Sequence, residues 1–305
     1  MPNSKAIARK LFRAMSTDIA TVCPEITAEV ACPLCMRRFT VDSIEDGRLS
    51  LEHVIPSALG GNVVTLTCTK CNNTDGTELD RNLVSAMQAL DGFEGRGAGL
   101  NAVWHNPTGH VVANVDWRVG TGEATSIKIV GKASNTAGID AIRAQLCDGA
   151  EFALTFNLGF VPEKYWRAAF RSAYLAAFER FGYAYLVSDN ARLVREVLDG
   201  TNAAPATILQ AFPELEPQKQ TFIIPIRGKW PGIVVILRLR SAVARYLAVL
   251  LPGREWTPLI EMAALHRELR LSTSRGGIEY VFRFGDDPVK VLRSSGYPGG
   301  ALAGC

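Results

Sequence analysis

Two Cys-x-x-Cys pairs constrain the fold of this chain more than any other feature of its sequence. The first pair is Cys32 and Cys35, and the second is Cys68 and Cys71. The two-residue spacing lets both sulfurs of one tight turn face the same ion, and four thiolates placed this way suit a tetrahedral Zn²⁺. A structural zinc at these cysteines would therefore hold together the two ends of the segment between them.

That segment carries a carboxylate and an imidazole side by side, Glu52 and His53, followed by Val-Ile-Pro. On a regular strand the two side chains would point to opposite faces, so we expect a bulge or twist that lets them converge on one substrate group. Asn72 and Asn73 directly follow the last cysteine, where a helix is predicted to begin. Carboxylate and carbonyl oxygens are hard ligands that suit Mg²⁺ or Mn²⁺, which leaves the imidazole available as a base.

Residues 32 to about 80 resemble the zinc-stapled HNH endonucleases, whose pattern is Cys-x-x-Cys, acid-His-[Ile/Val]-Ile-Pro, Gly-Gly and Cys-x-x-Cys-Asn. The resemblance implies a ββα-metal fold that grips one divalent cation and hydrolyses phosphodiesters in DNA. It assigns His53 as the general base and Glu52 and Asn72 as ligands of a catalytic Mg²⁺ or Mn²⁺, with Asn73 as the alternative to Asn72. It also implies a 5′-phosphate and a 3′-hydroxyl as products. One site would make a nick, so a double-strand cut would need two sites through dimerisation.

Two positions depart from the pattern of that family. The family's middle asparagine holds the histidine ring and usually lies five residues before the third cysteine, where this chain has Val63. The nearest candidate for its catalytic role is Asn62. The metal ligand beside the histidine is more often aspartate, and Glu52 differs from it by one methylene group, which changes its reach and not its ligand type.

Other functions remain compatible with the same residues. Two Cys-x-x-Cys pairs alone are typical of structural zinc knuckles, so a nucleic-acid-binding or regulatory protein without cleavage is the second hypothesis. A third is a nuclease effector whose C-terminal part senses a small ligand and gates the nuclease head. The main hypothesis, the endonuclease, would act in restriction or defence against phage, and an activating ligand or protein partner is left open. The chain has 33 Lys and Arg against 30 Asp and Glu, a balance that permits DNA as a partner without demanding it. The sequence also leaves open whether the protein forms a homo-oligomer.

The remaining cysteines, Cys23, Cys147 and Cys305, are scattered and odd in number. This usage is typical of reduced thiols and not of a secreted disulfide framework. Residues 1–15 lack the apolar core of a signal peptide, and the longest apolar runs have the length of strands. We therefore expect a soluble cytoplasmic protein that does not associate with a membrane.

The pattern of the whole chain predicts an α+β fold. We expect a small ββα-metal domain with a structural zinc, followed by a larger α+β domain with a mostly antiparallel sheet. The first domain, which includes an N-terminal helix, is placed at residues 1–92, and the second at residues 100–305, with a role in targeting, sensing or oligomerisation. The glycine-rich segment 91–99 is the predicted boundary. Within the first domain the expected elements are a helix over 5–16, strands at 41–44 and 49–55, and a helix over 72–90.

The C-terminal part is predicted to alternate strands and helices. Strands are expected at 100–106, 110–117, 125–132, 151–157, 220–226, 232–240, 244–250 and 278–284, and helices at 137–146, 163–181, 189–198 and 257–267. The helix over 163–181 has an aromatic stripe that is more often core than a surface for stacking bases, namely Trp166, Phe170, Tyr174 and Phe178, beside Lys164, Arg167 and Arg171. A late basic group could be solvated or could face phosphates: Arg227, Lys229, Arg238, Arg240, Arg245 and Arg254.

Overall fold

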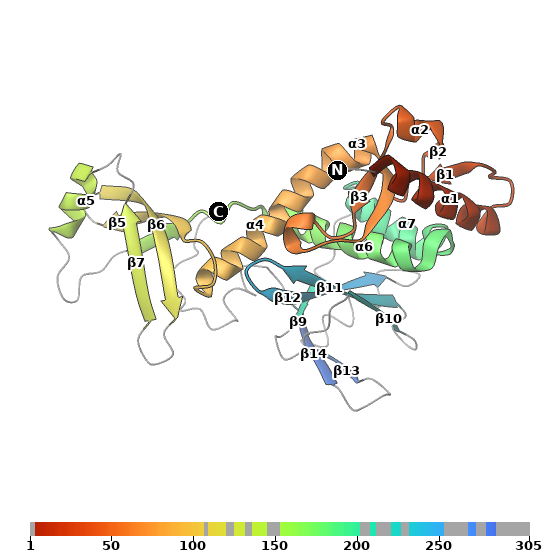
Figure 1. The fold of residues 1–305 in the computed structure, drawn as a ribbon. Helices are drawn as coiled ribbons and strands as arrows, with labels where there is room; N and C mark the ends of the chain where they lie inside the picture. Colours follow the sequence, from red (N-terminus) through yellow and green to blue (C-terminus); the bar gives the residue numbers. More distant parts are fainter. Residues whose placement is uncertain are drawn as a thin grey trace. The chain divides into compact units, whose positions relative to one another are not determined.

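The computed structural model describes most of the chain (Figure 1). The described residues are 4–106, 109–119, 125–131, 136–144, 153–201, 208–211, 221–226, 232–252, 268–272 and 279–284. They divide into two compact units, each of which is described by itself. Unit 1 takes its residues from Met1–Leu83, Val161–Arg240 and Ala244–Asp286, and unit 2 from Val84–Phe160, Ser241–Val243 and Asp287–Cys305.

An amphipathic helix, α1 (Ser4–Val22), opens unit 1. Its buried face has apolar residues spaced three or four apart, Ala8, Phe12, Met15 and Ile19. On its exposed side Lys5 and Arg9 both pair with Glu45, with N to O distances of 2.9 and 2.7 Å. The predicted helix over 5–16 is confirmed and extends further, and two of its basic side chains are already paired at the surface.

Short elements carry the two cysteine pairs. β1 (Glu29–Ala31) pairs with β2 (Arg38–Thr40), and the helical turn α2 (Asp42–Glu45) follows. β3 (Leu49–His53) pairs with β4 (Val64–Cys68) in an antiparallel hairpin. The predicted strand over 41–44 is wrong. Its adjacent residues Ser43 and Ile44 are both buried, which suits one face of a helical turn, whereas a strand would expose one of the two.

A nearly continuous helix follows β4. The short α3 (Thr69–Cys71) and a π-helical turn, η2 (Asn72–Gly76), lead into α4 (Thr77–Phe93). Leu79, Leu83 and Met87 are buried at helical spacing along α4. The predicted helix over 72–90 is confirmed, and the hairpin followed by this helix gives the ββα order.

Helix α6 (Pro162–Leu186) is the buried centre of unit 1. It contacts α1, α7 (Asp189–Leu198), β11 (Gly232–Arg240) and β12 (Ala244–Pro252). Three aromatic residues of its predicted stripe are buried, Phe170, Tyr174 and Phe178. The core interpretation of that stripe is therefore confirmed, and these rings are not a surface for stacking bases.

A glycine divides α6 into two segments. Gly182 has φ of +63°, and a Cβ atom there would lie 2.1 Å from Asp18 Oδ2 of α1. The same Oδ2 accepts a hydrogen bond from the Tyr183 amide at 2.7 Å. Asp18 thus satisfies an amide that the kink frees, which positions Tyr183 for the contact described below.

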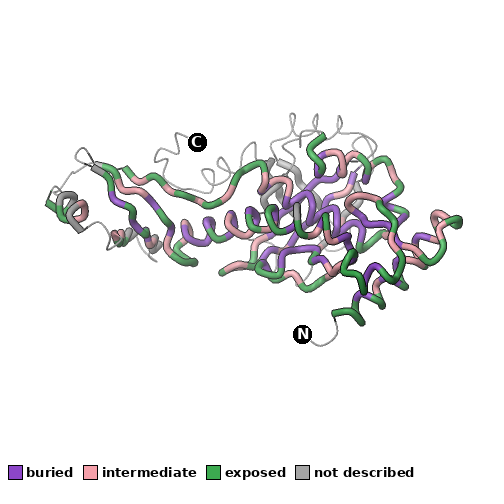
Figure 2. The backbone as a smooth tube through the Cα atoms, turned by 90° about the horizontal axis from the view of Figure 1, so that it is seen from above, coloured by how far each residue is buried: buried purple, intermediate pink, exposed green. Residues whose placement is uncertain are grey.

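Six antiparallel strands form the sheet of unit 1 in the order β10-β11-β12-β9-β14-β13. The four strands not yet introduced are β9 (Ile208–Ala211), β10 (Phe222–Ile226), β13 (Glu268–Ser272) and β14 (Glu279–Phe284). β11 and β12 are mostly buried. Figure 2 colours the buried residues of the chain purple. Arg238 and Arg240 flank buried Leu239 and so share a face of β11, as predicted. The predicted helix over 257–267 lies outside the described residues.

Unit 2 contains a four-stranded antiparallel sheet of order β7-β6-β5-β8. Its strands are β5 (Leu100–Asn106), β6 (Gly109–Val119), β7 (Thr125–Gly131) and β8 (Ala153–Phe156), and helix α5 (Thr136–Arg143) contacts β6. Val111, Ala113 and Val115 are buried at alternate positions of β6, so one face of this strand is covered. The predicted hairpin of 100–106 with 110–117 and the third strand are confirmed.

The chain therefore has a mixed α+β fold with antiparallel sheets, in which a small cysteine-bearing segment near the N-terminus precedes a larger part. The two compact units differ from the predicted domains 1–92 and 100–305, because α6 returns to pack on α1 within unit 1. A compact unit need not fold independently, so the domain boundaries stay a prediction. None of the described helices is long and apolar enough to cross a membrane.

Candidate active site and metal centre

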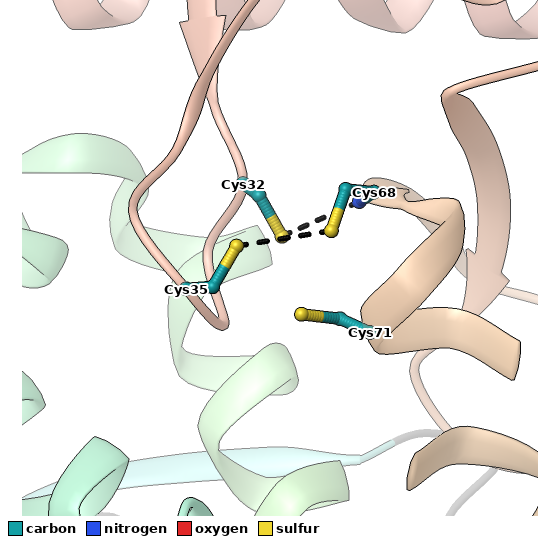
Figure 3. A group of neighbouring side chains, drawn as sticks. All are labelled: Cys32, Cys35, Cys68 and Cys71. Atoms are coloured by element: carbon teal, nitrogen blue, oxygen red, sulfur yellow. Dashed lines mark hydrogen bonds between the residues drawn. The ribbon is translucent and has the colours of Figure 1, made fainter. Parts of the chain in front are cut away.

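The four predicted zinc ligands come together in one cluster (Figure 3). The sulfur atoms of Cys32, Cys35, Cys68 and Cys71 all lie within 4.8 Å of one another, and 3.7 Å separates Cys35 Sγ from Cys68 Sγ. Tetrahedral Zn²⁺ with Zn–S bonds of about 2.3 Å places its sulfurs about 3.8 Å apart, whereas a disulfide needs about 2.05 Å. The spacing therefore fits a zinc site and not a disulfide.

Backbone hydrogen bonds shape the first cysteine turn. The Met36 amide donates to the Cys32 carbonyl at 2.8 Å, and the Cys32 amide donates to the Arg37 carbonyl at 2.9 Å. Met36 has φ of +59°, the left-handed conformation that closes this tight turn. From the second pair, the Cys68 amide donates to Cys32 Sγ at 3.3 Å. The backbone of both pairs thus orients the sulfurs inward.

Contacts with neighbouring thiols and with one arginine favour the thiolate at Cys35 and Cys68, whereas contacts with the other cysteines and burial raise the pKa of Cys32 and Cys71. Hydrogen bonding from Cys32 lowers the pKa of Cys35, and it lowers the pKa of Cys68 to about 6. Arg37 Nη2 donates to Cys68 Sγ at 3.2 Å, and Arg37 Nε donates to Cys35 Sγ at 3.4 Å. Because Zn²⁺ binds thiolates and not thiols, binding of the ion would release the protons that the other two cysteines retain.

Two tyrosines of α6 fasten the first cysteine turn to the core of unit 1. Tyr183 Oη donates to the Ala31 carbonyl at 2.6 Å and accepts from the Ala31 amide at 2.8 Å. Tyr174 Oη donates to the Pro33 carbonyl at 2.6 Å and accepts from Arg195 Nη1 at 2.9 Å. The zinc-binding turn is therefore held by a helix far away in sequence.

Glu52 and His53 occupy the last two positions of β3. They pair in register with Thr65 and Val64 of β4, so this end of the strand is regular. Glu52 is 4% exposed while His53 is exposed, in agreement with side chains on opposite faces. The bulge expected here is absent from the described hairpin, because the ladder of β3 and β4 continues through both residues.

Buried Glu52 is paired with an arginine of α6. Arg171 Nη2 lies 2.5 Å from Glu52 Oε1, and Arg171 Nη1 lies 3.5 Å from Asp80 Oδ1 of α4. Burial raises the pKa of Glu52, and the Arg171 guanidinium opposes that rise. Burial likewise raises the pKa of Asp80, against the opposing charges of Arg171 and His53. The Arg171 guanidinium thus forms ion pairs with two carboxylates at the predicted metal-binding side of the hairpin.

Asn72 lies in the π-helical turn and faces the hairpin. Its Nδ2 donates to Ser50 Oγ at 2.9 Å and to the Leu51 carbonyl at 3.0 Å. These bonds fix the amide so that the carbonyl oxygen Oδ1 is directed away from the strand, towards the space beside Gly76. Asn73 is exposed. Short π-helical segments often mark functional positions, and this one orients Asn72 rather than Asn73 at the hairpin.

Asn62 lies in the loop before β4 and is exposed. No hydrogen bond joins its side chain to His53 within the described chain, so its catalytic role stays a prediction without structural support.

The Gly-Gly pair before Asn62 allows the backbone of the loop to turn. Gly60 has φ of +82°, and a Cβ atom at Gly61 would lie 1.8 Å from the Ile55 carbonyl oxygen. The loop therefore needs glycine at both positions.

Sequence reasoning named Arg171 only as a cation beside the aromatic stripe and did not connect it to this site, and it missed Asp80. One signal for Arg171 was present, because it stands in an alanine- and aromatic-rich helix whose neighbours Phe170, Ser172 and Ala173 are buried. A charge in such a helix needs a partner. Asp80 had no comparable signal, because an acidic residue in the first turns of α4 is ordinary helix composition.

Glu52 and Asn72 provide oxygen donors with the chemistry of a site for a hard divalent cation. Glu52 supplies a carboxylate, and the fixed amide of Asn72 leaves its Oδ1 as an acceptor, which are ligands that Mg²⁺ and Mn²⁺ prefer. Among the described residues, the four cysteines are the one group of three or more His, Cys, Asp and Glu side chains close enough to share an ion. A cation at Glu52 would therefore rely on amide oxygen, substrate or water for further ligands.

Comparison with known families identifies this region of the chain. The family model described as HNH endonuclease matches residues 32–88, which include both cysteine pairs, the β3–β4 hairpin and most of α4. Comparisons with curated proteins and with solved structures gave no match. The matched segment contains the cysteine cluster, and Glu52 and His53 lie within it. Over residues 32–88, this chain therefore matches the HNH endonuclease family.

Proposed function

We propose that the protein is a metal-dependent endonuclease that hydrolyses phosphodiester bonds of DNA, with His53 as its general base. The observation that carries this proposal is the position of His53 at the end of β3 in a zinc-stapled HNH domain, exposed and adjacent to buried Glu52. An exposed imidazole at the loop end of the β3–β4 hairpin can reach a substrate that cannot enter the core.

Glu52 and Asn72 are the proposed ligands of the catalytic Mg²⁺ or Mn²⁺. Both offer hard oxygen atoms, and both are held by elements of the ββα unit, β3 and the π-helical turn. A bound divalent cation would act as a Lewis acid that stabilises negative charge on the scissile phosphate. Zinc at the four cysteines would have a structural task, because a site closed by four thiolates has no open position for substrate.

The residues of the chain would act on the attacking water and on the phosphate. A neutral imidazole at His53 accepts a proton from a water molecule placed in line with the bond to be broken. A bond forms from this water oxygen to phosphorus, and the bond from phosphorus to the 3′ oxygen breaks, after which the 3′ oxygen takes up a proton from solvent. The products are a 5′-phosphate and a 3′-hydroxyl.

A non-catalytic role in binding nucleic acid is the second candidate, and one observation favours it. Glu52 is already neutralised by Arg171, so its burial does not by itself require a metal ion. A zinc knuckle that only binds would keep the cysteine cluster and the hairpin without using His53. A role in restriction or phage defence, gating by a ligand or partner, and a homo-oligomer remain predictions.

Incubation with supercoiled plasmid separates the two candidates. The nuclease hypothesis predicts that the full-length protein converts supercoiled plasmid to nicked circles with Mg²⁺ or Mn²⁺, and that EDTA stops the reaction. End-labelling of the nicks should show 5′-phosphates. Protein that retards DNA in a gel but never nicks it, with either ion and over a range of salt concentrations, would instead support the binding module.

A further inference from the structure

Arg171 is a buried cation inside the proposed cation site, although it lies outside the HNH segment of the sequence. Its side chain is 3% exposed, and that of Glu52 is 5% exposed. The distance of 2.5 Å from Nη2 to Glu52 Oε1 makes this a close ion pair, and α6, the helix that carries Arg171, is fixed in the core of unit 1. Within the described chain, Arg171 is the cation that pairs with Glu52.

The pairing is close in distance but incomplete in hydrogen bonding. The Nη2–Oε1 contact lacks hydrogen-bond geometry, and Arg171 Nε is buried without a hydrogen-bond partner in the described part of the chain. Among the described residues, Nη1 has one long contact, of 3.5 Å with Asp80 Oδ1. A carboxylate that a guanidinium holds by charge more than by directed hydrogen bonds can exchange that guanidinium for another cation more readily than a carboxylate in a bidentate pair can.

Gly76 provides the space that Arg171 occupies. A Cβ atom at this position would lie 3.0 Å from Arg171 Nη2 and 3.4 Å from Asn72 Oδ1. The guanidinium therefore lies next to both proposed ligands, the Glu52 carboxylate and the Asn72 carbonyl oxygen. A divalent cation that uses these two oxygens would have to share the space with a positive charge.

We propose that Arg171 and the divalent cation compete for the Glu52 carboxylate. Arg171 holds Glu52 while the cation is absent, and cation binding loosens or breaks the ion pair because two cations cannot share a buried carboxylate without repulsion. This inference rests on the proposed function in one point, that Glu52 ligates the catalytic cation. It adds that a residue of α6 sets the affinity of the HNH site for its metal.

A hydrogen bond between α6 and the zinc-binding turn fixes the position of the helix that carries Arg171. Tyr174 lies one turn after Arg171 on α6, and its hydroxyl group donates to the carbonyl of Pro33 in the first cysteine turn. The helix that presents Arg171 to Glu52 is thus fixed against the zinc cluster. Arg171 therefore returns to a defined place whenever the cation leaves.

Equilibrium binding of Mn²⁺ to the full-length zinc-loaded protein tests the competition. Free Mn²⁺ is measured by electron paramagnetic resonance for the wild type, Arg171→Met, Arg171→Lys and Arg180→Met, the last an exposed arginine of the same helix. We expect Arg171→Met to bind Mn²⁺ at least about 10-fold more tightly than the wild type, and Arg171→Lys and Arg180→Met to stay within about 3-fold of it. The double variant Glu52→Gln with Arg171→Met should lose the gain. Equal or weaker binding by Arg171→Met would overturn the proposal.

Two further measurements cover the case in which Arg171→Met folds poorly. Without Arg171 the buried carboxylates lack a cation, so Mn²⁺ should raise the melting temperature of this variant more than that of the wild type. In the wild type itself, diamagnetic Mg²⁺ should shift the side-chain Nε–H resonance of Arg171 and leave that of Arg180 in place. If the Arg171 resonance does not shift at saturating Mg²⁺, the competition model is wrong.

These readouts are independent of DNA cleavage. If the wild type nicks plasmid while Arg171→Met binds Mn²⁺ no better, the competition is wrong and the nuclease assignment stands. If the wild type never nicks DNA while Arg171→Met gains Glu52-dependent Mn²⁺ affinity, the competition stands and the nuclease assignment fails.

Discussion

The hydroxyl group of Tyr183 exchanges two hydrogen bonds with the backbone of Ala31, giving one to its carbonyl oxygen at 2.6 Å and taking one from its amide at 2.8 Å. Both residues are buried. Ala31 directly precedes Cys32, so this exchange ends the β1 strand at a fixed distance from α6. The zinc cluster is therefore positioned by the helix as well as by its own turns.

Replacing Tyr183 by phenylalanine should destabilise the protein. The change leaves a buried amide and a buried carbonyl of Ala31 unsatisfied, which is expected to lower the free energy of unfolding by about 1–3 kcal/mol. Tyr185→Phe is a matched control in the same helix, because the Tyr185 hydroxyl is buried without a hydrogen-bond partner among the described residues. Urea denaturation should show a loss for Tyr183→Phe and none for Tyr185→Phe; equal losses would refute the role of the Ala31 contact.

Freshly purified protein should contain one zinc ion per chain. Cys68→Ser removes one of four thiolates and should release most of that zinc, and it should destabilise the hairpin region, because metal binding and local folding are coupled. Cys23→Ser serves as the control, since Cys23 lies outside the cluster. Inductively coupled plasma mass spectrometry measures the content. A preparation without zinc, or equal zinc loss in both variants, would defeat the assignment.

The two neighbouring asparagines after the last cysteine should differ in their effect on the catalytic cation. Asn72 is fixed by bonds to Ser50 and Leu51, whereas Asn73 is exposed. Asn72→Ala should weaken Mn²⁺ binding and slow plasmid nicking on the order of 10–100-fold, a range typical of lost support for a metal site. Asn73→Ala should match the wild type in both assays. If Asn73→Ala had the larger effects instead, Asn73 and not Asn72 would be the metal ligand.

Local spacing made much of the zinc and catalytic region predictable. Each cysteine pair is set by a turn of four residues, and the order of hairpin and helix follows from short-range pattern, so both could be inferred from sequence. The segment 41–44 was misjudged because four residues with two apolar positions fit a strand or one helical turn equally well. The structure settles this through the burial of adjacent Ser43 and Ile44.

Contacts between distant segments could not be inferred in the same way. The partner of Glu52 lies on α6, and only the packing of that helix in unit 1 brings Arg171 to the hairpin. Convergence of Glu52 and His53 through a bulge was expected because both were assigned to one substrate group. The regular ladder of β3 instead gives one side chain to the core and the other to the surface.

The rate of plasmid nicking by His53→Ala, measured under single-turnover conditions with Mn²⁺, tests the central claim most directly. His105→Ala is the matched control, an exposed histidine of β5 with no proposed role. A general base typically contributes about 10²–10⁴-fold to the rate, so His53→Ala should be slower by that factor while His105→Ala keeps the wild-type rate. A His53→Ala protein that nicks as fast as the wild type would contradict the account.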